Sequence, residues 1–341
     1  MPITNPEAVD FGYLVAFAEG MYAPQSVTPG DGARVTAAGW DIVGHLIARD
    51  SILPDMSSLG PNDPKALQLG PLVFYGYLAR NHADPTRYVA AIRGTNGFAE
   101  WVIDADFFLR DAPSSPGAKV EQGFWSVYDS MMLFGLDGVQ IGAKAADGIA
   151  SVVGQATVTI CGHSLGSAVA TYLSFDVGKL MGARASACLF ASPRTGDLAW
   201  TAAYAATVAT CRLMNYVLDV VPYAPLDAPP GFQYSTLPSA EIILPSAAQA
   251  EVRFDLICDH TIICYCAMID YADTKARASV QDAAAWSCIV GPPAFSLNRQ
   301  LTLALATAAE ALGKAGDDVL RLVDVSAKAK GGHVSAEPTR L

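Results

Sequence analysis

The chain has 341 residues, of which 52% are hydrophobic and only 16% charged, and its mean hydropathy is +0.28. This composition excludes disordered, fibrous and collagen-like chains, and it provides a large core together with apolar surface of the kind that meets lipid or another apolar partner. The formal net charge of −11, without a long basic run, excludes a nucleic-acid binder and predicts that any contact with lipid is mainly hydrophobic.

The first half of the chain predicts two helices with a loop and three strands between them. Residues 7–22 carry apolar side chains at near-helical spacing and predict a helix, while residues 23–39 are rich in turn formers and predict a loop. The segment after Gly123 predicts a helix to about residue 150. The expected strands are residues 40–48, 71–79 and 87–94.

From residue 155 onward, strand-like and helical runs alternate. This alternation is typical of a parallel sheet whose strands are connected by crossover helices. The expected strands are 155–161, 184–191 and 210–218, and the expected helices are 165–180 and 199–209. The sequence therefore predicts an α/β fold with a mostly parallel central sheet and helices on both faces.

Residues 1–341 are expected to form one domain, because no internal repeat and no linker divides the chain. Its core is expected at about 71–290, with a Pro-rich loop at 225–250 and a C-terminal amphipathic helix and polar tail at 297–341. The N-terminus carries no signal-peptide pattern, and no run of 18 apolar residues predicts a membrane-spanning helix. As read, the chain is expected to be cytoplasmic, or secreted if it is a mature form.

The seven cysteines do not form a recognisable framework. An odd number cannot close a set of disulfides, and a chain of this length does not need one. Cys161, Cys188 and Cys211 lie inside apolar strand-like runs, which favours buried free thiols. Cys264 and Cys266 form a C-x-C pair without a second pair at zinc-ligand spacing, so neither a metal nor a cofactor is expected.

The strongest local motif is Gly162-His163-Ser164-Leu165-Gly166, a G-x-S-x-G. It follows a β-branched apolar strand and opens a helix rich in small residues, which is the setting of a nucleophile elbow. The turn lifts the Ser164 hydroxyl clear of the sheet, and it places the N-terminus of the helix beside a developing oxyanion. The alternative is a glycine-lined turn with an inactive serine, which this context disfavours.

A serine hydroxyl needs a base to become a nucleophile, and the chain has five histidines. Three of them are poor candidates for the base: His45 lies in an early strand pattern, His82 in a polar turn and His333 in the polar tail. His163 is adjacent to the serine and points to the other side of the elbow, so it is expected to pack or to orient. His260 remains, at the start of an apolar segment downstream of the elbow.

The third member should be a carboxylate that follows a strand, between the serine and the histidine in chain order. Asp219 ends the strand-like run at 210–218, and active sites of α/β proteins gather at the carboxyl edge of the sheet. Asp255 and Asp259 are rivals, although Asp259 adjoins His260 and cannot easily reach its ring. We expect both to be solvated loop residues.

Several motifs in order over about residues 87–265 resemble the class 3 (fungal-type, triacylglycerol) lipases. The resemblance implies an α/β-hydrolase fold, a catalytic triad of Ser164, Asp219 and His260, and hydrolysis of lipid esters. The sequence departs from the family pattern at Ser167 and Ala191, where glycine is commoner. The matching segments are Arg93-Gly94-Thr95, Gly123-Phe124, GHSLGSA (162–168), FASPRTGD (190–197), NYVLDVVPYAP (215–225) and DHTIICY (259–265).

The resemblance also implies two oxyanion donors and a lid. Thr95 would supply a backbone N–H together with its hydroxyl, and Leu165 would supply a backbone N–H; the alternative for Thr95 is an ordinary turn residue. The lid would be the helix at about 96–109, where Phe98, Trp101 and Val102 share one face and would cover the serine. A fixed amphipathic core helix is the alternative interpretation of that segment.

The expected function is that of a carboxylic ester hydrolase of lipase type, which acts on acylglycerols or similar lipid esters at a lipid–water interface. Phospholipase A1 and an aryl- or feruloyl-type esterase are the alternatives on the same scaffold. A non-catalytic lipid-binding protein is the alternative from another class, and the intact Ser-Asp-His set speaks against it. The oligomeric state, the acyl chain length and the head group are not determined by the sequence.

Overall fold

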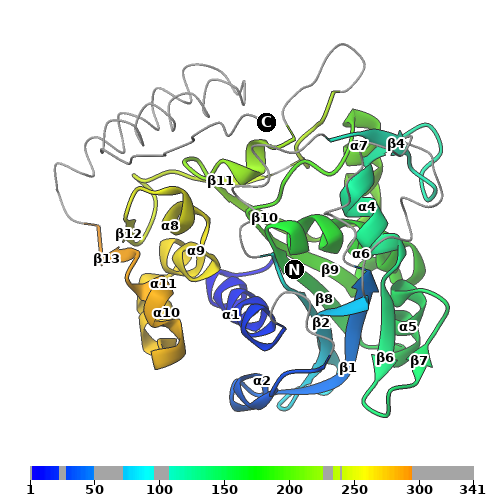
Figure 1. The fold of residues 1–341 in the computed structure, drawn as a ribbon, viewed down its shortest axis with the longest axis horizontal. Helices are drawn as coiled ribbons and strands as arrows, with labels where there is room; N and C mark the ends of the chain where they lie inside the picture. Colours follow the sequence, from blue (N-terminus) through cyan, green and yellow to red (C-terminus); the bar gives the residue numbers. More distant parts are fainter. Residues whose placement is uncertain are drawn as a thin grey trace, which may run out of the picture.

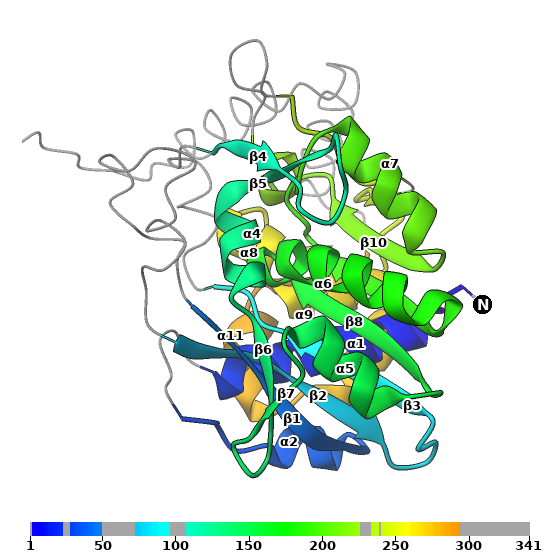
Figure 2. The ribbon, with the colours of Figure 1, turned by 90° about the vertical axis from the view of Figure 1, so that its right-hand side faces the viewer.

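A computed structural model describes residues 2–22, 28–49, 72–95, 107–225, 233–238 and 240–293 (Figure 1). Within these residues, nine strands form one sheet with helices on both faces (Figures 1 and 2), which confirms the predicted fold class. In sheet order the strands are β11 (Glu241–Ile243), β10 (Cys211–Tyr216), β9 (Ala185–Phe190), β8 (Thr157–His163), β3 (Arg87–Ile92), β2 (Leu72–Asn81), β1 (Trp40–Arg49), β6 (Met132–Gly135) and β7 (Gln140–Ile141).

The half of the sheet from β3 to β11 is parallel. Parallel strands covered by helices are buried on both sides and therefore consist of continuous apolar runs, as β8 and β9 do. The strands expected around residues 90, 158, 187 and 214 are confirmed. The strand β11 was missed, because it is only three residues long and lies in the segment expected to be a Pro-rich loop.

The other half of the sheet is antiparallel, and here one prediction was wrong. The segment after Gly123 is not one helix, because the hairpin of β6 and β7 separates α4 (Gln122–Asp129) from α5 (Ala145–Val153). The turn of this hairpin contains Asp137-Gly138, and Gly138 has a φ of 77° that a residue with a Cβ rarely adopts. An Asp-Gly pair between apolar residues is a hairpin signal, and the helical interpretation overlooked it.

The helices form two layers, one on each face of the sheet (Figures 1 and 2). On one face α4 and α5 pack with α6 (Leu165–Met181) and α7 (Leu198–Thr207). The described helices of the other layer and its edge are α1 (Asn5–Met21), α2 (Ala33–Ala37), α8 (Leu256–His260), α9 (Ile262–Ile269), α10 (Tyr271–Arg277) and α11 (Ala283–Trp286). The smaller elements are β4 (Leu109–Asp111), β5 (Lys119–Glu121), β12 (Glu251–Val252), β13 (Ile289–Gly291), η3 (Gly182–Arg184), η4 (Val221–Tyr223) and η5 (Val280–Asp282).

Two expectations for the ends of the chain have different outcomes. The segment expected as a loop at 23–39 contains the short helix α2, so that prediction was incomplete. The C-terminal helix and tail expected at 297–341 lie outside the described residues, and the single-domain organisation stays a prediction. No described helix combines the length and the apolar character that crossing a membrane requires.

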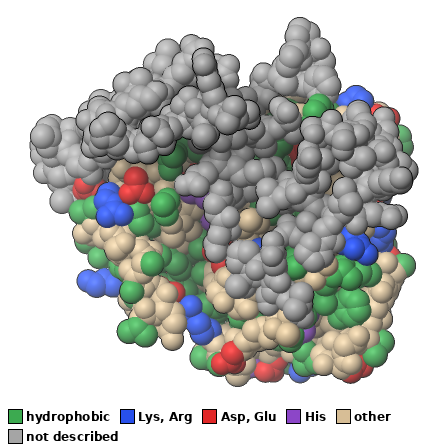
Figure 3. Space-filling view, viewed as in Figure 1, with side chains coloured by type: hydrophobic (Ala, Val, Ile, Leu, Met, Phe, Trp, Pro, Cys, Tyr) green, Lys and Arg blue, Asp and Glu red, His purple; other side chains and the backbone are tan. Residues whose placement is uncertain are grey.

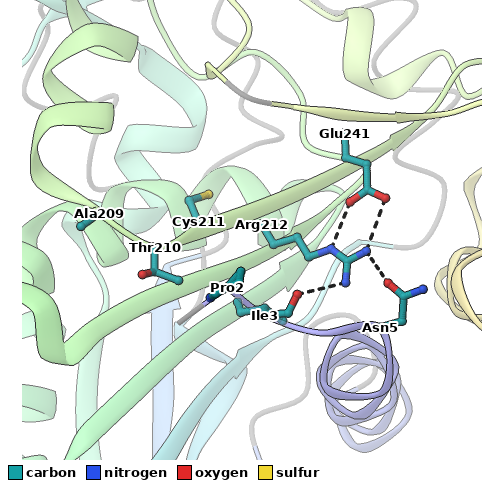
Figure 4. A pocket seen from close by; sticks show the side chains of 8 residues that line it. All are labelled: Pro2, Ile3, Asn5, Ala209, Thr210, Cys211, Arg212 and Glu241. Carbon is teal, nitrogen blue, oxygen red and sulfur yellow. Dashed lines mark hydrogen bonds and ion pairs between the residues drawn. The ribbon is translucent and has the colours of Figure 1, made fainter.

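The helix α1 is held firmly against the sheet. It begins with a capping box in which Thr4 and Glu7 satisfy each other's backbone N–H groups. Beside its first turn is a cavity of about 650 Å³, where the guanidinium of Arg212 on β10 binds both carboxylate oxygens of Glu241 and the side-chain oxygen of Asn5 (Figure 4). A bidentate guanidinium–carboxylate pair fixes geometry as well as charge, so α1 is anchored to two strands.

A disulfide between Cys258 and Cys288 was not predicted. It connects α8, which carries His260, to the residue that precedes β13. Cys161 and Cys188 are buried free thiols as expected, and Cys211 is a partly buried one. The odd count of cysteines excluded a complete set of bridges but not a single one.

Replacement of both Cys258 and Cys288 by alanine should lower the free energy of unfolding by about 3–4 kcal/mol, because the bridge closes a loop of 30 residues in the unfolded chain. Urea unfolding with and without dithiothreitol measures the difference. Cys211→Ala is the matched control, since its midpoint should respond to reductant as the wild type does. A wild-type midpoint that is insensitive to complete reduction would contradict the prediction.

A buried carboxylate caps α4. The two oxygens of Glu121 accept hydrogen bonds from the backbone N–H groups of Gly123 (2.9 Å) and Phe124 (2.6 Å). Burial nevertheless dominates and raises the pKa of Glu121 to about 7, although these bonds favour the ionised form. The folded protein therefore binds this proton more tightly than the unfolded chain does.

Glu121 should make the protein less stable as the pH rises from about 4.5 to 7, because the unfolded chain releases this proton first. The difference in unfolding free energy between wild type and Glu121→Gln should change by about 3 kcal/mol across this window. Urea unfolding of both proteins at several pH values measures that difference, in which the shared titration of other carboxylates cancels. Parallel stability curves for the two proteins would contradict the raised pKa.

Candidate active site

The candidate site begins with the sharp turn between β8 and α6. Ser164 occupies this turn with φ 60° and ψ −130°, a conformation that costs energy for a residue with a Cβ. A Cβ on Gly162 would lie 2.2 Å from the carbonyl oxygen of Gly166, and a Cβ on Gly166 would lie 2.5 Å from the carbonyl oxygen of Arg93. Only glycine lets strand, helix and neighbouring strand pass this closely, so the predicted elbow is present.

The structure brings Ser164, His260 and Asp219 together, although they are far apart in the sequence. The Ser164 hydroxyl lies 2.7 Å from Nε2 of His260, and Nδ1 of His260 lies 2.8 Å from Oδ2 of Asp219. The carboxylate can only accept, so His260 carries its proton on Nδ1 and presents Nε2 to the serine as an acceptor. This is the arrangement that a general base and its orienting acid require.

Asp219 is almost fully buried, and its carboxylate accepts hydrogen bonds from two donors besides His260. The backbone N–H of Val221 donates to Oδ1 (3.0 Å), and the hydroxyl of Tyr265 donates to Oδ2 (2.8 Å). Tyr265 in turn accepts from the backbone N–H of Tyr216 (2.8 Å). Tyr265 was not predicted: it lies in α9, which the extended residue Thr261 separates from His260 at the end of α8, so no helical spacing relates the two.

The two rival acids have other positions. Asp255 caps α8, where its side chain accepts hydrogen bonds from two backbone N–H groups and pairs with Arg253. Asp259 is buried in α8 next to His260, so the expectation of a solvated loop residue was wrong. Both ring nitrogens of His260 already face Asp219 and the serine, which leaves no ring nitrogen for Asp259.

The end of β3 lies beside the elbow. A Cβ on Gly94 would lie 3.3 Å from the Cβ of Ser164 and 3.1 Å from the carbonyl oxygen of His163. Thr95 follows directly, and its hydroxyl is buried without a hydrogen-bond partner among the described residues. Leu165 begins α6, so its backbone N–H is one of the first-turn donors that the helix leaves unpaired. The Thr95 hydroxyl and the backbone N–H of Leu165 are therefore unused hydrogen-bond donors on either side of Ser164.

This constellation can be compared with known proteins. The family model for class 3 lipases matches residues 89–228, which include the elbow, Thr95 and Asp219. Over this segment the chain is similar to the class 3 lipases. His260 lies beyond the matched segment, so the contact with Ser164 and Asp219 comes from the structure and not from the family match.

Two relatives illustrate the range of this family. The chain is 31% identical to a secreted mono- and diacylglycerol lipase A of Penicillium cyclopium, over 44% of this chain and 47% of the relative. It is 33% identical to phospholipase A1-II 7 of Oryza sativa subsp. indica, over 40% of this chain and 41% of the relative. The chain thus spans about half the length or less of the curated relatives that it matches.

A solved structure gives the likeness in fold. The comparison structure comes from a family of fungal lipases described for an unusual buried polar cluster, and it is 23% identical to this chain. The superposition has a TM-score of 0.50 and covers 72% of this chain and 82% of the other. This likeness concerns the fold alone.

The two departures from the class 3 lipase pattern lie close to the elbow. Ala191 has a φ of 49°, in the left-handed region where glycine is favoured, which explains why glycine is the commoner residue at this place in the motif. Ser167 lies in the first turn of α6, is fully buried, and has a hydroxyl without a partner among the described residues. The chain therefore accepts backbone strain at one position and an unsatisfied hydroxyl at the other.

The end of the predicted lid helix was wrong, because residues 107–109 are not helical and Leu109 begins β4. The rest of the segment, with Phe98, Trp101 and Val102, lies outside the described residues. The lid stays a prediction. In the described part of the chain, no group of three or more His, Cys, Asp or Glu side chains is placed to hold a metal ion.

Gly166→Ala should lower the free energy of unfolding by about 1–3 kcal/mol, because the added Cβ meets backbone oxygens of Ile92 and Arg93 that cannot move aside. Gly20→Ala is the matched control: Gly20 lies in α1 with open space around its Cβ position, so this change should stabilise by about 0.5–1 kcal/mol. Urea unfolding compares the two variants. Equal stability of Gly166→Ala and wild type would show that the close approach at the elbow is not required.

Proposed function

We propose that the chain is a serine-dependent carboxylic ester hydrolase of lipase type, with Ser164, Asp219 and His260 as its catalytic triad. The observation that carries the proposal is the hydrogen-bonded chain from the Ser164 hydroxyl through His260 to the buried Asp219, at a strained elbow. The match of residues 89–228 to the class 3 lipases supports the same reaction.

The proposed reaction has two steps. His260 takes the proton of Ser164 while the serine oxygen attacks the ester carbonyl, and the resulting imidazolium is stabilised by Asp219. The backbone N–H groups of Leu165 and Thr95, with the Thr95 hydroxyl, hold the oxyanion, and such donors contribute about 3–4 kcal/mol each. His260 then protonates the leaving alcohol. Water, activated by the same base, attacks the acyl-enzyme and releases the carboxylic acid.

We propose acylglycerols or similar lipid esters as the substrate. The similarity to a mono- and diacylglycerol lipase supports this choice, and the similarity to a phospholipase A1 makes phospholipids the second candidate. Among the described residues on the face seen in Figure 3, Lys and Arg side chains lie scattered and do not form a patch. The net charge of −11 also disfavours attraction to an anionic lipid surface, so uncharged acylglycerols fit better.

A substrate panel tests this order. It would contain p-nitrophenyl esters from short to long acyl chains, diolein, triolein, phosphatidylcholine and an aryl ester such as methyl ferulate. Fastest turnover of the glycerides supports the proposal, and fastest turnover of phosphatidylcholine or methyl ferulate replaces it by the corresponding alternative. No turnover together with no labelling by a fluorophosphonate would favour a lipid-binding protein.

Ser164→Ala should abolish turnover of p-nitrophenyl esters and labelling by a fluorophosphonate probe, because the covalent step loses its nucleophile. The melting temperature should stay close to that of the wild type, since alanine removes only one oxygen. Ser167→Ala is the control, because it removes the neighbouring buried hydroxyl and should leave labelling intact. Wild-type activity in purified Ser164→Ala would refute the assignment.

Asp219→Asn should lower kcat by about 10⁴-fold, because an amide no longer fixes the His260 proton on Nδ1. Asp255→Asn serves as the comparison, since its carboxylate only caps α8 and should change kcat little. Steady-state kinetics on a soluble ester, corrected for the folded fraction, measures both. A larger loss of kcat in Asp255→Asn than in Asp219→Asn would show that Asp219 is not the acid of the triad.

A further inference from the structure

The helix α1 brings a carboxylate to the elbow from outside the segment that matches the lipase family. Oε1 of Glu19 lies 2.9 Å from Nδ1 of His163, and the same oxygen accepts the backbone N–H of Gly94 at 3.4 Å. The other ring nitrogen of His163 lies 2.7 Å from the backbone carbonyl oxygen of His260. Glu19 thus touches the residue before Thr95 and the residue before Ser164, and through His163 it reaches the backbone of His260.

The partners of His163 define its protonation state. A carbonyl oxygen can only accept, so Nε2 must donate to it, and the ionised carboxylate of Glu19 can only accept, so Nδ1 must donate as well. A ring that donates from both nitrogens is an imidazolium. Burial alone would lower the pKa of His163, but the charge and the hydrogen bond of Glu19, together with the charge of Asp219, raise it above its usual value.

We propose that Glu19 and His163 form an ion pair that positions the three parts of the catalytic centre relative to one another: the end of β3, the elbow and the backbone of His260. Both are positioning residues, and the inference rests on the proposed function. The pair is suited to this task because the side chain of His163 is only 7% exposed, and because Arg212 anchors α1 to the sheet through Asn5.

The ion pair also balances charge beside the base. The rings of His163 and His260 lie 4.7 Å apart between centroids, so a lone cation at His163 would oppose the imidazolium that His260 forms during turnover. Glu19 on one side and Asp219 on the other supply the compensating negative charges. Tyr265 is a further titratable group beside His163, and the centroids of their rings lie 6.3 Å apart.

Glu19→Gln tests the proposal, because the amide keeps the shape but cannot neutralise His163. We expect kcat on p-nitrophenyl butyrate to fall about ten-fold or more while KM changes by less than about two-fold, since the reacting groups and not the binding of ester are misplaced. Asp10→Asn is the matched control: it removes an acid from the same helix together with its pair to Arg277, away from the elbow. Titration with a fluorophosphonate corrects each rate for the fraction of competent sites.

A second readout does not depend on activity. ¹⁵N NMR of wild-type protein with labelled histidine should show both ring nitrogens of His163 protonated at pH 7, and in Glu19→Gln only one; His163→Asn assigns the signal. A neutral His163 in the wild type, or Glu19→Gln with the kinetics of Asp10→Asn, overturns the inference. A wild type with protonated His163 but without ester turnover or labelling refutes the proposed function and leaves the ion pair standing.

Discussion

The close passage of β8, α6 and β3 at the elbow is the constraint on which the rest of the site depends. The turn brings the buried Ser164 hydroxyl within 2.7 Å of His260, and its backbone adopts a conformation that costs of order 1–3 kcal/mol, which the surrounding packing must sustain. Glycines at positions 162 and 166 allow carbonyl oxygens of one element to lie against the backbone of the next. A side chain at either position would separate Ser164 from the end of β3, where Gly94 and Thr95 lie.

Buried charge is the second physical theme. An isolated carboxylate in the interior is unfavourable by several kcal/mol, and Asp219 and Glu121 are both surrounded by donors. Asp219 accepts from His260, Tyr265 and a backbone N–H, and Glu121 accepts from the first turn of α4. A carboxylate held by several hydrogen bonds has one favourable orientation, and a site for proton transfer needs such fixed groups.

The two halves of the sheet position different residues of the site. Successive strands of the parallel half end at the same edge, where Ser164 follows β8, Asp219 follows β10 and Thr95 follows β3. The antiparallel half and α1 complete the core on the other side and bring Glu19 to the elbow. The segment that matches the family model carries Ser164 and Asp219, whereas His260 comes from beyond its end and Glu19 from before its start.

The sequence by itself determined the local features, because periodicity, turn chemistry and short motifs act between residues that are near in the chain. The strands of the parallel half, the elbow and the choice of Asp219 and His260 followed from such signals, and the order of motifs indicated the family. Only the tertiary structure decided the rest, since contacts between distant segments leave no local pattern. The pairing of Cys258 with Cys288, the donation of Tyr265 to Asp219, and the meeting of Glu19 with His163 across 144 positions are of this kind. The hairpin at Asp137-Gly138 is the exception: its signal was local, and only the helical interpretation of its surroundings hid it.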